Sequence, residues 1–522
     1  MPTDHFANSR LKPWLLLLFV AYYCIGVIFA VNSPGSWDEL NSRNYGIAGI
    51  DHARLYFEEG GIRKPKIGME HGSSHEILFH GVEKLSGLNP ETELREILKL
   101  RHVAIFTLFF FGVVAFFLLC RHLFSSPMLA LLGVIFLVFH PRIFSHSFYN
   151  SYDISFLSAC IIAVYCIYIM AHEKSYLWIF LAAVSTAFAV GIRLPGIMLA
   201  GFGLYALVAQ ILIMGNRSGS ALLRCLVFIA MTGFFTILFW PFLWGYPVDN
   251  FKFAFDGMSG LKFSSGLIYW GEFLKSDNVP WHYNFSYFLV TTPVIILAPV
   301  LFGHLVVLGK VCGSGKRFFD NWMLHIILGW VWVPLGLAIL LHSTLFDSWR
   351  HHYFIYPGLV LIGLYGVRAI QQRFFGKIRA FGAWPAVFAS LLIWPLVSLH
   401  PYQGIYLNFI PTLFPEAQNS VGNPFDIDYW GLTYKEGLEF IAKSSDDAVV
   451  VVRMDKPAYT NWILLDDEFR QKITRVKSGD CDYHMSNYKK VGAEPPKWID
   501  NEEVYSRSYK SYQVLTVRKC GS

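Results

Sequence analysis

Charged residues are scarce in this sequence, and their scarcity limits the class of protein that it can encode. Asp, Glu, Lys and Arg make up 15% of the 522 residues, whereas hydrophobic residues make up 54%. Ordinary soluble domains carry roughly 25% charged residues. Runs such as 103–119 and 323–341 contain no Asp, Glu, Lys or Arg, so helices formed there would be apolar on every face. Water would leave such helices uncovered, which excludes an ordinary soluble fold and indicates an integral membrane protein.

Several sequence motifs are also absent. The chain contains no GxGxxG after a predicted strand, no GxxxxGK[ST] and no HExxH, which excludes the common nucleotide-binding and metalloprotease motifs. No two cysteines have CxxC spacing, so a zinc site is not expected. No internal repeat is visible, which argues against an inverted-repeat transporter. The net charge of +6 is spread over short clusters between hydrophobic runs, so we expect no nucleic-acid partner.

The chain instead contains about eleven hydrophobic runs that approach the ~20 residues needed for a helix to cross a bilayer. The runs are Pro13–Val31, Val103–Cys120, Met128–Phe139, Ile154–Ala171, Trp178–Gly191, Gly196–Met214, Cys225–Leu243, Phe285–Gly309, Met323–Leu341, Phe354–Val367 and Ala383–Leu399. The first run follows Arg10 and Lys12 and resembles a signal peptide, but its weak cleavage-site character favours an uncleaved span. We therefore predict an α-helical polytopic membrane protein.

The distribution of basic residues predicts the orientation of these helices. Every second loop is short and basic, without a skip. The residues concerned are Arg10, Lys12, Arg121, Lys174, Arg217, Arg224, Lys310, Lys316, Arg317, Arg368, Arg373, Lys377 and Arg379. Because short cytoplasmic loops are enriched in Lys and Arg, the N-terminus is predicted to be cytoplasmic. An odd number of crossings then places the C-terminus outside.

Three long segments share the predicted outer side, namely 32–100, 244–284 and 400–522. We expect residues 1–399 to form a transmembrane domain that includes the first outer loop, and residues 400–522 to form a small α+β domain. Within the latter, 434–443 is helix-like, and 448–453 and 512–517 are strand-like. Cys481 and Cys520 also lie there, either as a disulfide or as two free thiols.

Two adjacent carboxylates, Asp38 and Glu39, follow the first predicted span. An acidic pair at this position can simply be the solvated end of a loop. A carboxylate held where the dielectric constant falls can instead have a raised pKa and act as a general base. The neighbouring Trp37 could anchor the pair at the membrane interface.

Three further polar clusters interrupt the hydrophobic regions. The first, 140–153, contains His140, Arg142 and Asp153; the second is Arg193 followed by Leu-Pro-Gly; the third, 347–353, contains Arg350 and His351. By the predicted topology, all lie on the same side of the membrane as Asp38. Each alone could be an interfacial anchor or an interhelical salt bridge. Charges at membrane depth are costly unless they are paired or face a polar cavity, so together the clusters indicate one shared cavity.

The residue types in this predicted cavity suit phosphate chemistry. Arg142, Arg193 and Arg350 are permanent cations whose donors match phosphate oxygens. The histidines and the carboxylates supply acid–base groups, and we count His140 among the residues expected to bind substrate. Such a site suits transfer from a membrane-embedded, phosphate-linked donor to an acceptor that arrives from outside.

At these residues the chain resembles the GT-C class of polyprenyl-phosphate-sugar-dependent glycosyltransferases, and especially glycosyltransferase family 39, the protein mannosyltransferase and aminoarabinose transferase group. The matching features are the acidic pair in a long first outer loop and the stretches HPRIFSHSFYNSYDISF, WRHHYFIYP, HPYQGIYLN and DYWGLTYKEGL. The resemblance in layout covers nearly the whole chain.

The resemblance implies inverting sugar transfer at the outer face, with Asp38 as the base that deprotonates the acceptor hydroxyl. The leaving polyprenyl phosphate is assigned to some of Arg142, Arg193, Arg350 and His351. Glu39 and Asp153 would orient the acceptor, tune Asp38 or hold a basic side chain. No cofactor or metal ligand set is expected, and metal dependence varies across the class.

Two alternatives remain. A transporter or flippase for a lipid-linked or anionic solute could use the same basic cavity, and Pro195, Pro241 and Pro334 interrupt apolar runs as in many transporters. A non-catalytic scaffold is the third possibility, but it leaves the buried charges without a purpose. By resemblance, the expected partners are a lipid-linked sugar, membrane lipid and a glycan, lipid or protein acceptor, and the expected setting is a bacterial inner membrane.

Overall fold

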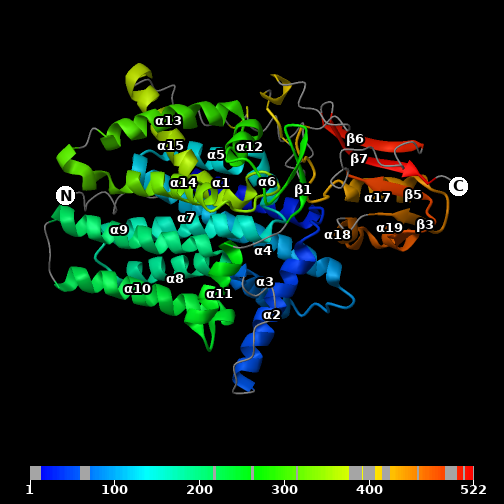
Figure 1. The fold of residues 1–522 in the computed structure, drawn as a ribbon, viewed down its shortest axis with the longest axis horizontal. Helices are drawn as coiled ribbons and strands as arrows, with labels where there is room; N and C mark the ends of the chain where they lie inside the picture. Colours follow the sequence, from blue (N-terminus) through cyan, green and yellow to red (C-terminus); the bar gives the residue numbers. More distant parts are fainter. Residues whose placement is uncertain are drawn as a thin grey trace.

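The molecule is a long bundle of helices with a small α/β unit at one end (Figure 1). The structure is a computed structural model. It describes residues 13–58, 71–214, 219–259, 264–312, 315–375, 389, 391, 406–408, 410–413, 424–454, 458–487, 502–509 and 512–520. We call the end of the bundle that carries the α/β unit the sheet end.

Within these residues, eight helical segments are long and apolar enough to cross a membrane, and two shorter apolar helices accompany them. The ten helices are α1 (Pro13–Asn32), α4 (Leu94–Phe124), α5 (Pro127–Val138), α7 (Ser151–His172), α8 (Tyr176–Ile192), α9 (Ile197–Met214), α10 (Gly219–Phe239), α13 (Val294–Cys312), α14 (Trp322–Leu340) and α15 (Tyr356–Ile370). They correspond to the first ten predicted runs. The eleventh, 383–399, and the predicted boundary between 399 and 400 fall almost entirely outside the described residues. The prediction of a polytopic helical membrane protein is confirmed.

Prolines divide two of the predicted runs. The run 285–309 consists of α12 (Tyr283–Thr291) and α13, because Thr292 before Pro293 is extended, with φ −97° and ψ 130°. The run 225–243 ends as a helix at Phe239, and Pro241–Leu243 forms the separate 3-10 turn η3. Proline disfavours the helical conformation of the residue before it, which hydrophobicity alone does not reveal.

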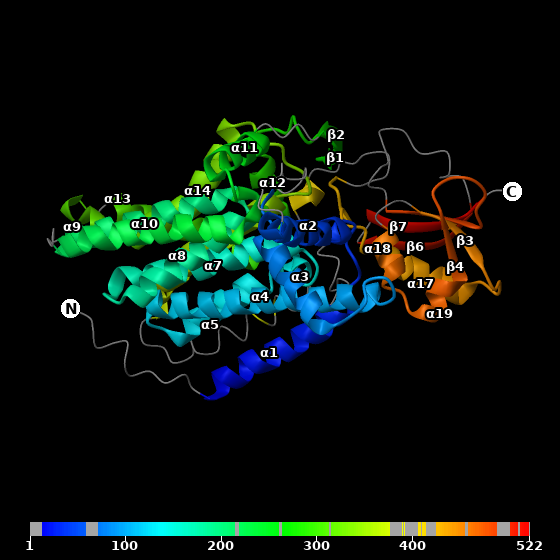
Figure 2. The same ribbon diagram turned by 90° about the horizontal axis from the view of Figure 1, so that it is seen from below.

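Packing places α7 and α15 in the interior of the bundle and α1 at its edge, as Figure 2 shows for α1. The apolar window of α7 is 83% buried and that of α1 only 17% buried. Helices α13 and α15 approach closely at Gly303, where an added Cβ would lie 2.0 Å from the carbonyl oxygen of Ile362. Small residues allow such close contact between membrane helices.

Basic side chains lie at the end of the bundle opposite the sheet end. Arg368 donates to the carbonyl oxygen of Phe124 at 2.9 Å, and Arg224 donates to that of Met170 at 2.7 Å. These carbonyls belong to the C-terminal ends of α4 and α7, where positive charge is favourable. The structure therefore brings basic residues of alternate loops together, and the assignment of this end to the cytoplasm stays a prediction.

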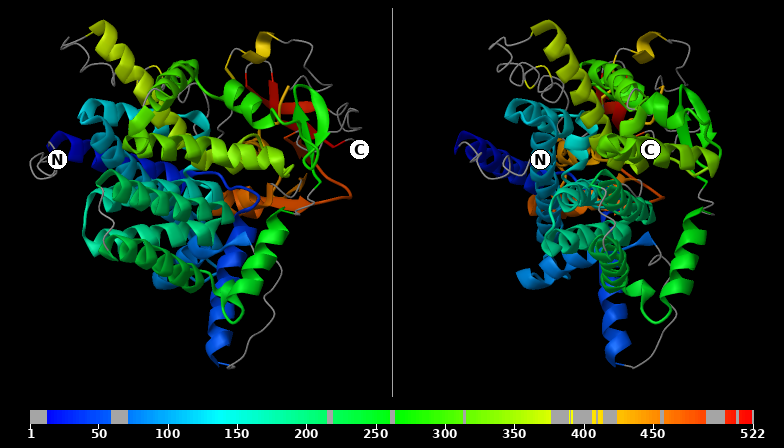
Figure 3. Two further views of the ribbon diagram at one scale, coloured as in Figure 1. Left: turned by 60° about the vertical axis from the view of Figure 1, so that its left-hand side comes forward. Right: turned by 90° about the vertical axis from the view of Figure 1, so that its left-hand side faces the viewer.

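Short helices and a hairpin cover the sheet end. They are α2 (Glu39–Glu58), α3 (Ser74–Ser86), α6 (Pro141–His146), η2 (Leu194–Gly196), α11 (Pro247–Ser259), β1 (Gly266–Tyr269), β2 (Glu272–Lys275) and η5 (Arg350–Ile355). Figure 3 shows α2 and α11, in blue and green, extending away from the bundle.

The C-terminal unit packs three helices against a five-stranded sheet. The helices are α17 (Tyr434–Ser444), α18 (Ala458–Ile463) and α19 (Asp467–Lys472), and the strands are β3 (Val450–Arg453), β4 (Ile473–Val476), β5 (Tyr483–Ser486), β6 (Glu503–Tyr509) and β7 (Tyr512–Lys519). The strand order is β4-β3-β5-β7-β6, with β3 parallel to β4 and β5. The predicted helix 434–443 and the strands at 448–453 and 512–517 are confirmed.

Cys481 and Cys520 form a disulfide across a separation of 39 residues, with Cα atoms 5.8 Å apart. The bond joins the chain just before β5 to the chain just after β7. Of the two states that the sequence left open for these cysteines, the structure has the disulfide.

Candidate functional site

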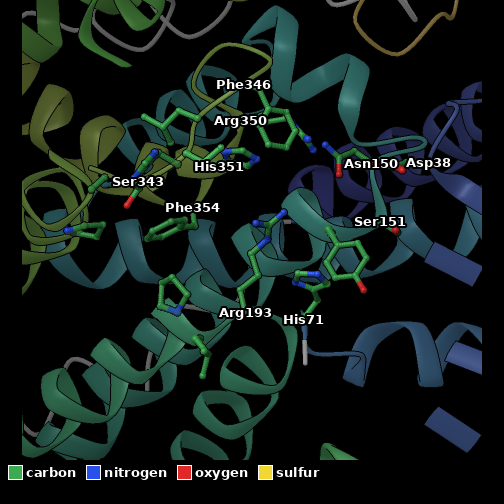
Figure 4. A pocket seen from close by; sticks show the side chains of 18 of the residues that line it. Asp38, His71, Asn150, Ser151, Arg193, Ser343, Phe346, Arg350, His351 and Phe354 are labelled. Atoms are coloured by element: carbon green, nitrogen blue, oxygen red, sulfur yellow. The ribbon is translucent and has the colours of Figure 1, made fainter. Parts of the chain in front are cut away.

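A cavity of about 530 Å³ lies at the sheet end of the bundle, and both polar and apolar side chains line it (Figure 4). The polar residues of the lining include Ser36, Asp38, Glu39, His71, Arg193, Arg350 and His351. Many of its apolar residues come from η2, α9, α11, α14 and the segment after α14, namely Pro195, Ile197, Phe251, Phe255, Pro334, Leu337, Ala338 and Leu341. Such a cavity suits a ligand that has a charged head and a hydrophobic tail.

Asp38 stands at the start of α2, on the wall of this cavity. Its backbone oxygen accepts from the amide of Ser42 at 2.9 Å, which begins the helix. Its side chain is half-buried, and Oδ1 accepts a long hydrogen bond of 3.4 Å from Asn41. Within the described part of the chain, its carboxylate forms no salt bridge with a Lys or Arg, that is, no contact of 4.0 Å or less. The group therefore has accepting oxygens available at the cavity.

Glu39 is the neighbour of Asp38, but its carboxylate is engaged with protein groups. Oε1 accepts from the amide of Ser36 at 2.6 Å, and Oε2 lies 2.8 Å from Nε2 of His102 on α4. The other ring nitrogen of His102 lies 3.2 Å from the carbonyl oxygen of Ala30. The side chain of Glu39 thus ties the loop before α2 to α1 and α4. Of the roles that the sequence left open for Glu39, this geometry favours holding a basic side chain.

Asp153 lies behind the cavity wall, where it contacts two arginines. Arg193 donates to Oδ1 at 2.6 Å, and Arg350 donates to Oδ2 at 3.2 Å. Asn150 caps α7 by accepting from the Asp153 amide at 3.0 Å and also donates to Oδ2 at 2.9 Å. Asp153 is 3% exposed and does not line the cavity. Its geometry favours a role in orienting the two guanidinium groups.

Arg193 reaches the cavity because the chain is extended between α8 and η2. It has φ −148° and ψ 137°, and its side chain remains 21% exposed. The guanidinium also lies over the ring of Tyr152, 5.7 Å from its centroid. Figure 4 shows Arg193 directed toward the side of the cavity where Arg350 and His351 lie.

Arg350 is buried and is held from several sides. Its Nε lies 3.3 Å from Asp347, and its guanidinium carbon lies 4.7 Å and 4.8 Å from the ring centroids of Phe346 and Trp430. Asp347 and Ser348 both have positive φ, 55° and 57°, which is unusual for residues other than glycine. Consecutive residues in this conformation cost energy and occur mainly where a functional loop requires a particular shape.

Arg142 and His140, which we also predicted to bind substrate, lie deeper in the protein. Arg142 lies 3.7 Å from Asp347, and neither residue lines the cavity. His140 lies 3.2 Å from the hydroxyl of Thr292, and burial together with the nearby Arg142 lowers its pKa to about 3. The structure thus places Asp38, Glu39, Arg193, Arg350 and His351 at the cavity and leaves Arg142, His140 and Asp153 outside its lining.

Sequence patterns did not single out several residues that line the cavity, among them His71, Tyr45, Tyr152 and Trp430. Trp430 belongs to DYWGLTYKEGL and Tyr152 to HPRIFSHSFYNSYDISF, so their motifs were noticed, but neither residue was assigned to the site. His71 and Tyr45 belong to the first predicted outer loop, where no spacing pattern distinguishes them.

A second group of buried charges lies next to the cavity, on α2, α3 and α4. Arg101 donates to Glu76 and, at 2.7 Å, to Glu83, and Arg43 lies 3.0 Å from Glu83. Burial opposes the ionisation of Glu76, but its ion pair with Arg101 and contact with His75 outweigh burial and lower its pKa to about 2. The His75 ring lies 4.4 Å, centroid to centroid, from Tyr152 of the cavity wall. Within the described residues, no group of three or more His, Cys, Asp or Glu could hold a metal ion.

Comparisons with known proteins agree with the sequence motifs. The family model described as dolichyl-phosphate-mannose-protein mannosyltransferase matches residues 15–253, which include Asp38, Asp153 and Arg193. No curated protein matches the chain.

Solved structures with a similar arrangement include ArnT from Cupriavidus metallidurans bound to undecaprenyl phosphate. This match has 13% identity and a TM-score of 0.44, and it covers 97% of this chain and 98% of ArnT. The same protein in the apo state gives 13% identity, the same coverage and a TM-score of 0.45. The Archaeoglobus fulgidus oligosaccharyltransferase in complex with Zn and sulfate gives 12% identity and a TM-score of 0.42, with 86% of this chain and 61% of that chain covered. Over residues 15–253 the chain is therefore similar to the dolichyl-phosphate-mannose-protein mannosyltransferase family, which confirms the resemblance that its motifs indicate.

Proposed function

We propose that this protein is a membrane glycosyltransferase that moves a sugar from a polyprenyl-phosphate donor to an acceptor hydroxyl at the outer face of the membrane. One observation carries the proposal. Asp38, without an ion-pair partner among the described residues, lines the same cavity as the guanidinium groups of Arg193 and Arg350. Two of these three residues lie in the segment that matches a glycosyltransferase family.

The residues supply the groups that such a transfer needs. Asp38 accepts the proton of the acceptor hydroxyl, whose oxygen forms a bond to the anomeric carbon. The bond from that carbon to the phosphate oxygen breaks, and polyprenyl phosphate leaves with the electron pair. Attack from the side opposite the leaving group inverts the configuration. Arg193 and Arg350, and the half-buried His351, stabilise the charge on the departing phosphate.

The apolar residues that line the cavity support a lipid-linked donor. Ile197 of α9, Leu337 of α14 and Leu341, which directly follows α14, line the cavity. Phe255 of α11 also lines it, and this side chain is 55% exposed. A prenyl chain would cover this apolar surface while its phosphate meets the arginines. The acceptor would then approach from the sheet end, near Ser36 and Asp38.

The test is a comparison of Asp38→Asn with Asp51→Asn in cells that lack the native protein. Asp51 lies on α2, the helix that begins directly after Asp38, but it is half-exposed and outside the cavity lining, so it is a matched control. We expect lipid-linked sugar to accumulate without the protein, as measured by mass spectrometry. Wild type and Asp51→Asn should clear the pool, whereas Asp38→Asn, inserted at a normal level, should not. Clearance by Asp38→Asn would reject Asp38 as the base.

A further outcome would reject the enzymatic proposal as a whole. If the wild-type protein left the lipid-linked sugar pool unchanged but moved an anionic solute into sealed vesicles, the cavity would belong to a transporter.

A further inference from the structure

Asn461, in helix α18 of the C-terminal unit, contacts the loop that leads to Asp38. Its side chain is completely buried. The amide oxygen accepts from the Gly35 amide at 3.0 Å, and the amide nitrogen donates to the Gly35 carbonyl at 2.8 Å. The same nitrogen donates to the Gly431 carbonyl at 2.7 Å. One side chain thus joins two segments that are far apart in the sequence.

The orientation of this amide follows from its partners. Carbonyl oxygens can only accept hydrogen bonds and a backbone N–H can only donate, so the side-chain nitrogen must face Gly35 O and Gly431 O. Asparagine supplies both the donors and the acceptor that this position needs, whereas aspartate lacks the donors and alanine lacks all of them. Because the site is buried, any group left without a partner carries a desolvation cost.

The backbone at Gly35 is shaped to receive α18. An added Cβ at Gly35 would lie 2.5 Å from Cγ2 of Thr460 and 2.8 Å from Cδ1 of Leu464. A side chain there would push the loop and α18 apart. The close approach therefore requires glycine, and it brings the Gly35 backbone within reach of Asn461.

Both segments that Asn461 joins belong to the cavity. Gly35 immediately precedes Ser36, which lines the cavity and whose amide is bound by Glu39 at 2.6 Å. Gly431 follows Trp430, whose ring lies 4.8 Å from the Arg350 guanidinium carbon. The loop before Asp38 is thus held by Glu39, which contacts His102, and also by Asn461.

We infer that Asn461 is a positioning residue for the transfer reaction, and that the C-terminal unit acts through it to hold Asp38 at the cavity. The inference rests on the proposed function, because it assigns Asn461 to the placement of the proposed base. Arg350 is also held by Asp153 and Asp347, at 3.2 Å and 3.3 Å, so the phosphate side depends less on Asn461. Loss of the Asn461 contacts should therefore impair turnover more than donor binding.

The experiment compares Asn461→Ala and Gly35→Ala with Asp466→Ala in the purified full-length protein. Gly35→Ala disturbs the same contact by changing Gly35 in place of Asn461. An effect that both variants share is therefore not caused by misfolding of one variant alone. Asp466 pairs with Arg95 at another contact between the C-terminal unit and α4, and its side chain is 73% exposed, so its variant is the matched control. Two quantities are measured for each variant, namely hydrogen exchange of the segment that contains Gly35, and kcat and donor KM per folded molecule.

We expect Asn461→Ala and Gly35→Ala to speed exchange at Gly35 and to lower kcat by about 10- to 100-fold, because small misplacements of a reacting group have effects of this size. Donor KM should change less than threefold, and Asp466→Ala should match wild type. Unchanged exchange in Asn461→Ala, or faster exchange with wild-type kcat, would overturn the inference.

The two proposals fail in different ways. If wild type transferred no sugar from any polyprenyl-phosphate donor, the proposed function would fall, and with it the positioning role. If wild type transferred sugar but Asn461→Ala did so equally well, only the role of Asn461 would fall.

Discussion

Arg193 donates to Asp153 at 2.6 Å, although the two residues are 40 positions apart and come from opposite ends of their helices. The same carboxylate accepts from Arg350 at 3.2 Å. Asp153 therefore fixes the separation of two cations that face the cavity. Free guanidinium groups would repel one another and rotate away, whereas a shared carboxylate holds them in place for a phosphate.

Replacement of Asp153 by asparagine should destabilise the protein and weaken donor binding. Breaking a buried pair by removing one partner costs about 3–5 kcal/mol, because it leaves a buried charge without compensation. We expect a lower thermal midpoint in detergent and a higher donor KM. Asp249→Asn, at an exposed position in the first turn of α11, is the control. A thermal midpoint equal to that of wild type would contradict the bridging role.

Two of the three arginines that we predicted to bind phosphate, Arg193 and Arg142, should behave differently from each other when replaced. Arg193 lines the cavity, whereas Arg142 contacts Asp347 and lies outside the lining. Arg193→Ala should raise donor KM about 10- to 100-fold, because the phosphate would lose one or two hydrogen bonds to a charged group. Arg142→Ala should mainly reduce the yield of folded protein. The measurement is donor KM per folded molecule, and a larger increase for Arg142→Ala than for Arg193→Ala would contradict the geometry.

The sequence predicted the helices and the gathering of the polar clusters at one end of the bundle better than it predicted which residues line the cavity. Hydrophobic length identifies ten helices, and the alternation of loops brings Asp38, Arg193 and Arg350 to the same end of the bundle. Whether a side chain faces the cavity depends on local backbone angles, such as the extended Arg193 or the positive φ of Asp347. Those angles depend on tertiary contacts, which hydrophobicity and charge patterns do not encode.

The contacts that the C-terminal unit makes with the cavity could not be predicted from the sequence, for a different reason. Asn461 and Gly35 are 426 positions apart, and a single asparagine in a short helix has no periodicity or motif that reveals its partner. The motif with Asp428, Tyr429 and Trp430 was visible, but its contact with Arg350 depends on how residues 424–432 pack against the bundle.

His102 should influence turnover through Glu39. Its ring nitrogens face Glu39 at 2.8 Å and Ala30 O at 3.2 Å, so His102→Asn would release the loop before α2. We expect kcat to fall about tenfold, since one charge-assisted hydrogen bond is lost, and donor KM to stay near that of wild type. His172→Asn, an exposed histidine at the opposite end of the bundle, is the control. A change in donor KM without a change in kcat would contradict this role.

The charge network beside the cavity predicts a pH dependence of stability. The ion pair with Arg101 lowers the pKa of Glu76 from 4.5 to about 2, against the opposing effect of burial. A carboxyl group whose pKa is lower in the folded state stabilises that state at pH values above its unfolded pKa. This stabilisation is lost as the pH falls from about 4.5 toward 2. The thermal midpoint of the wild-type protein should therefore decline across this window.

Glu76→Gln should remove this dependence. The variant should be less stable than wild type at pH 7, by about 3 kcal/mol for a broken buried pair. Its thermal midpoint should fall less steeply between pH 4.5 and 2, because glutamine does not titrate. Glu91→Gln, at an exposed position before α4, should keep the wild-type slope. Thermal unfolding in detergent at stepped pH values measures all three proteins, and equal slopes for wild type and Glu76→Gln would show that the Glu76–Arg101 pair does not set the acid stability.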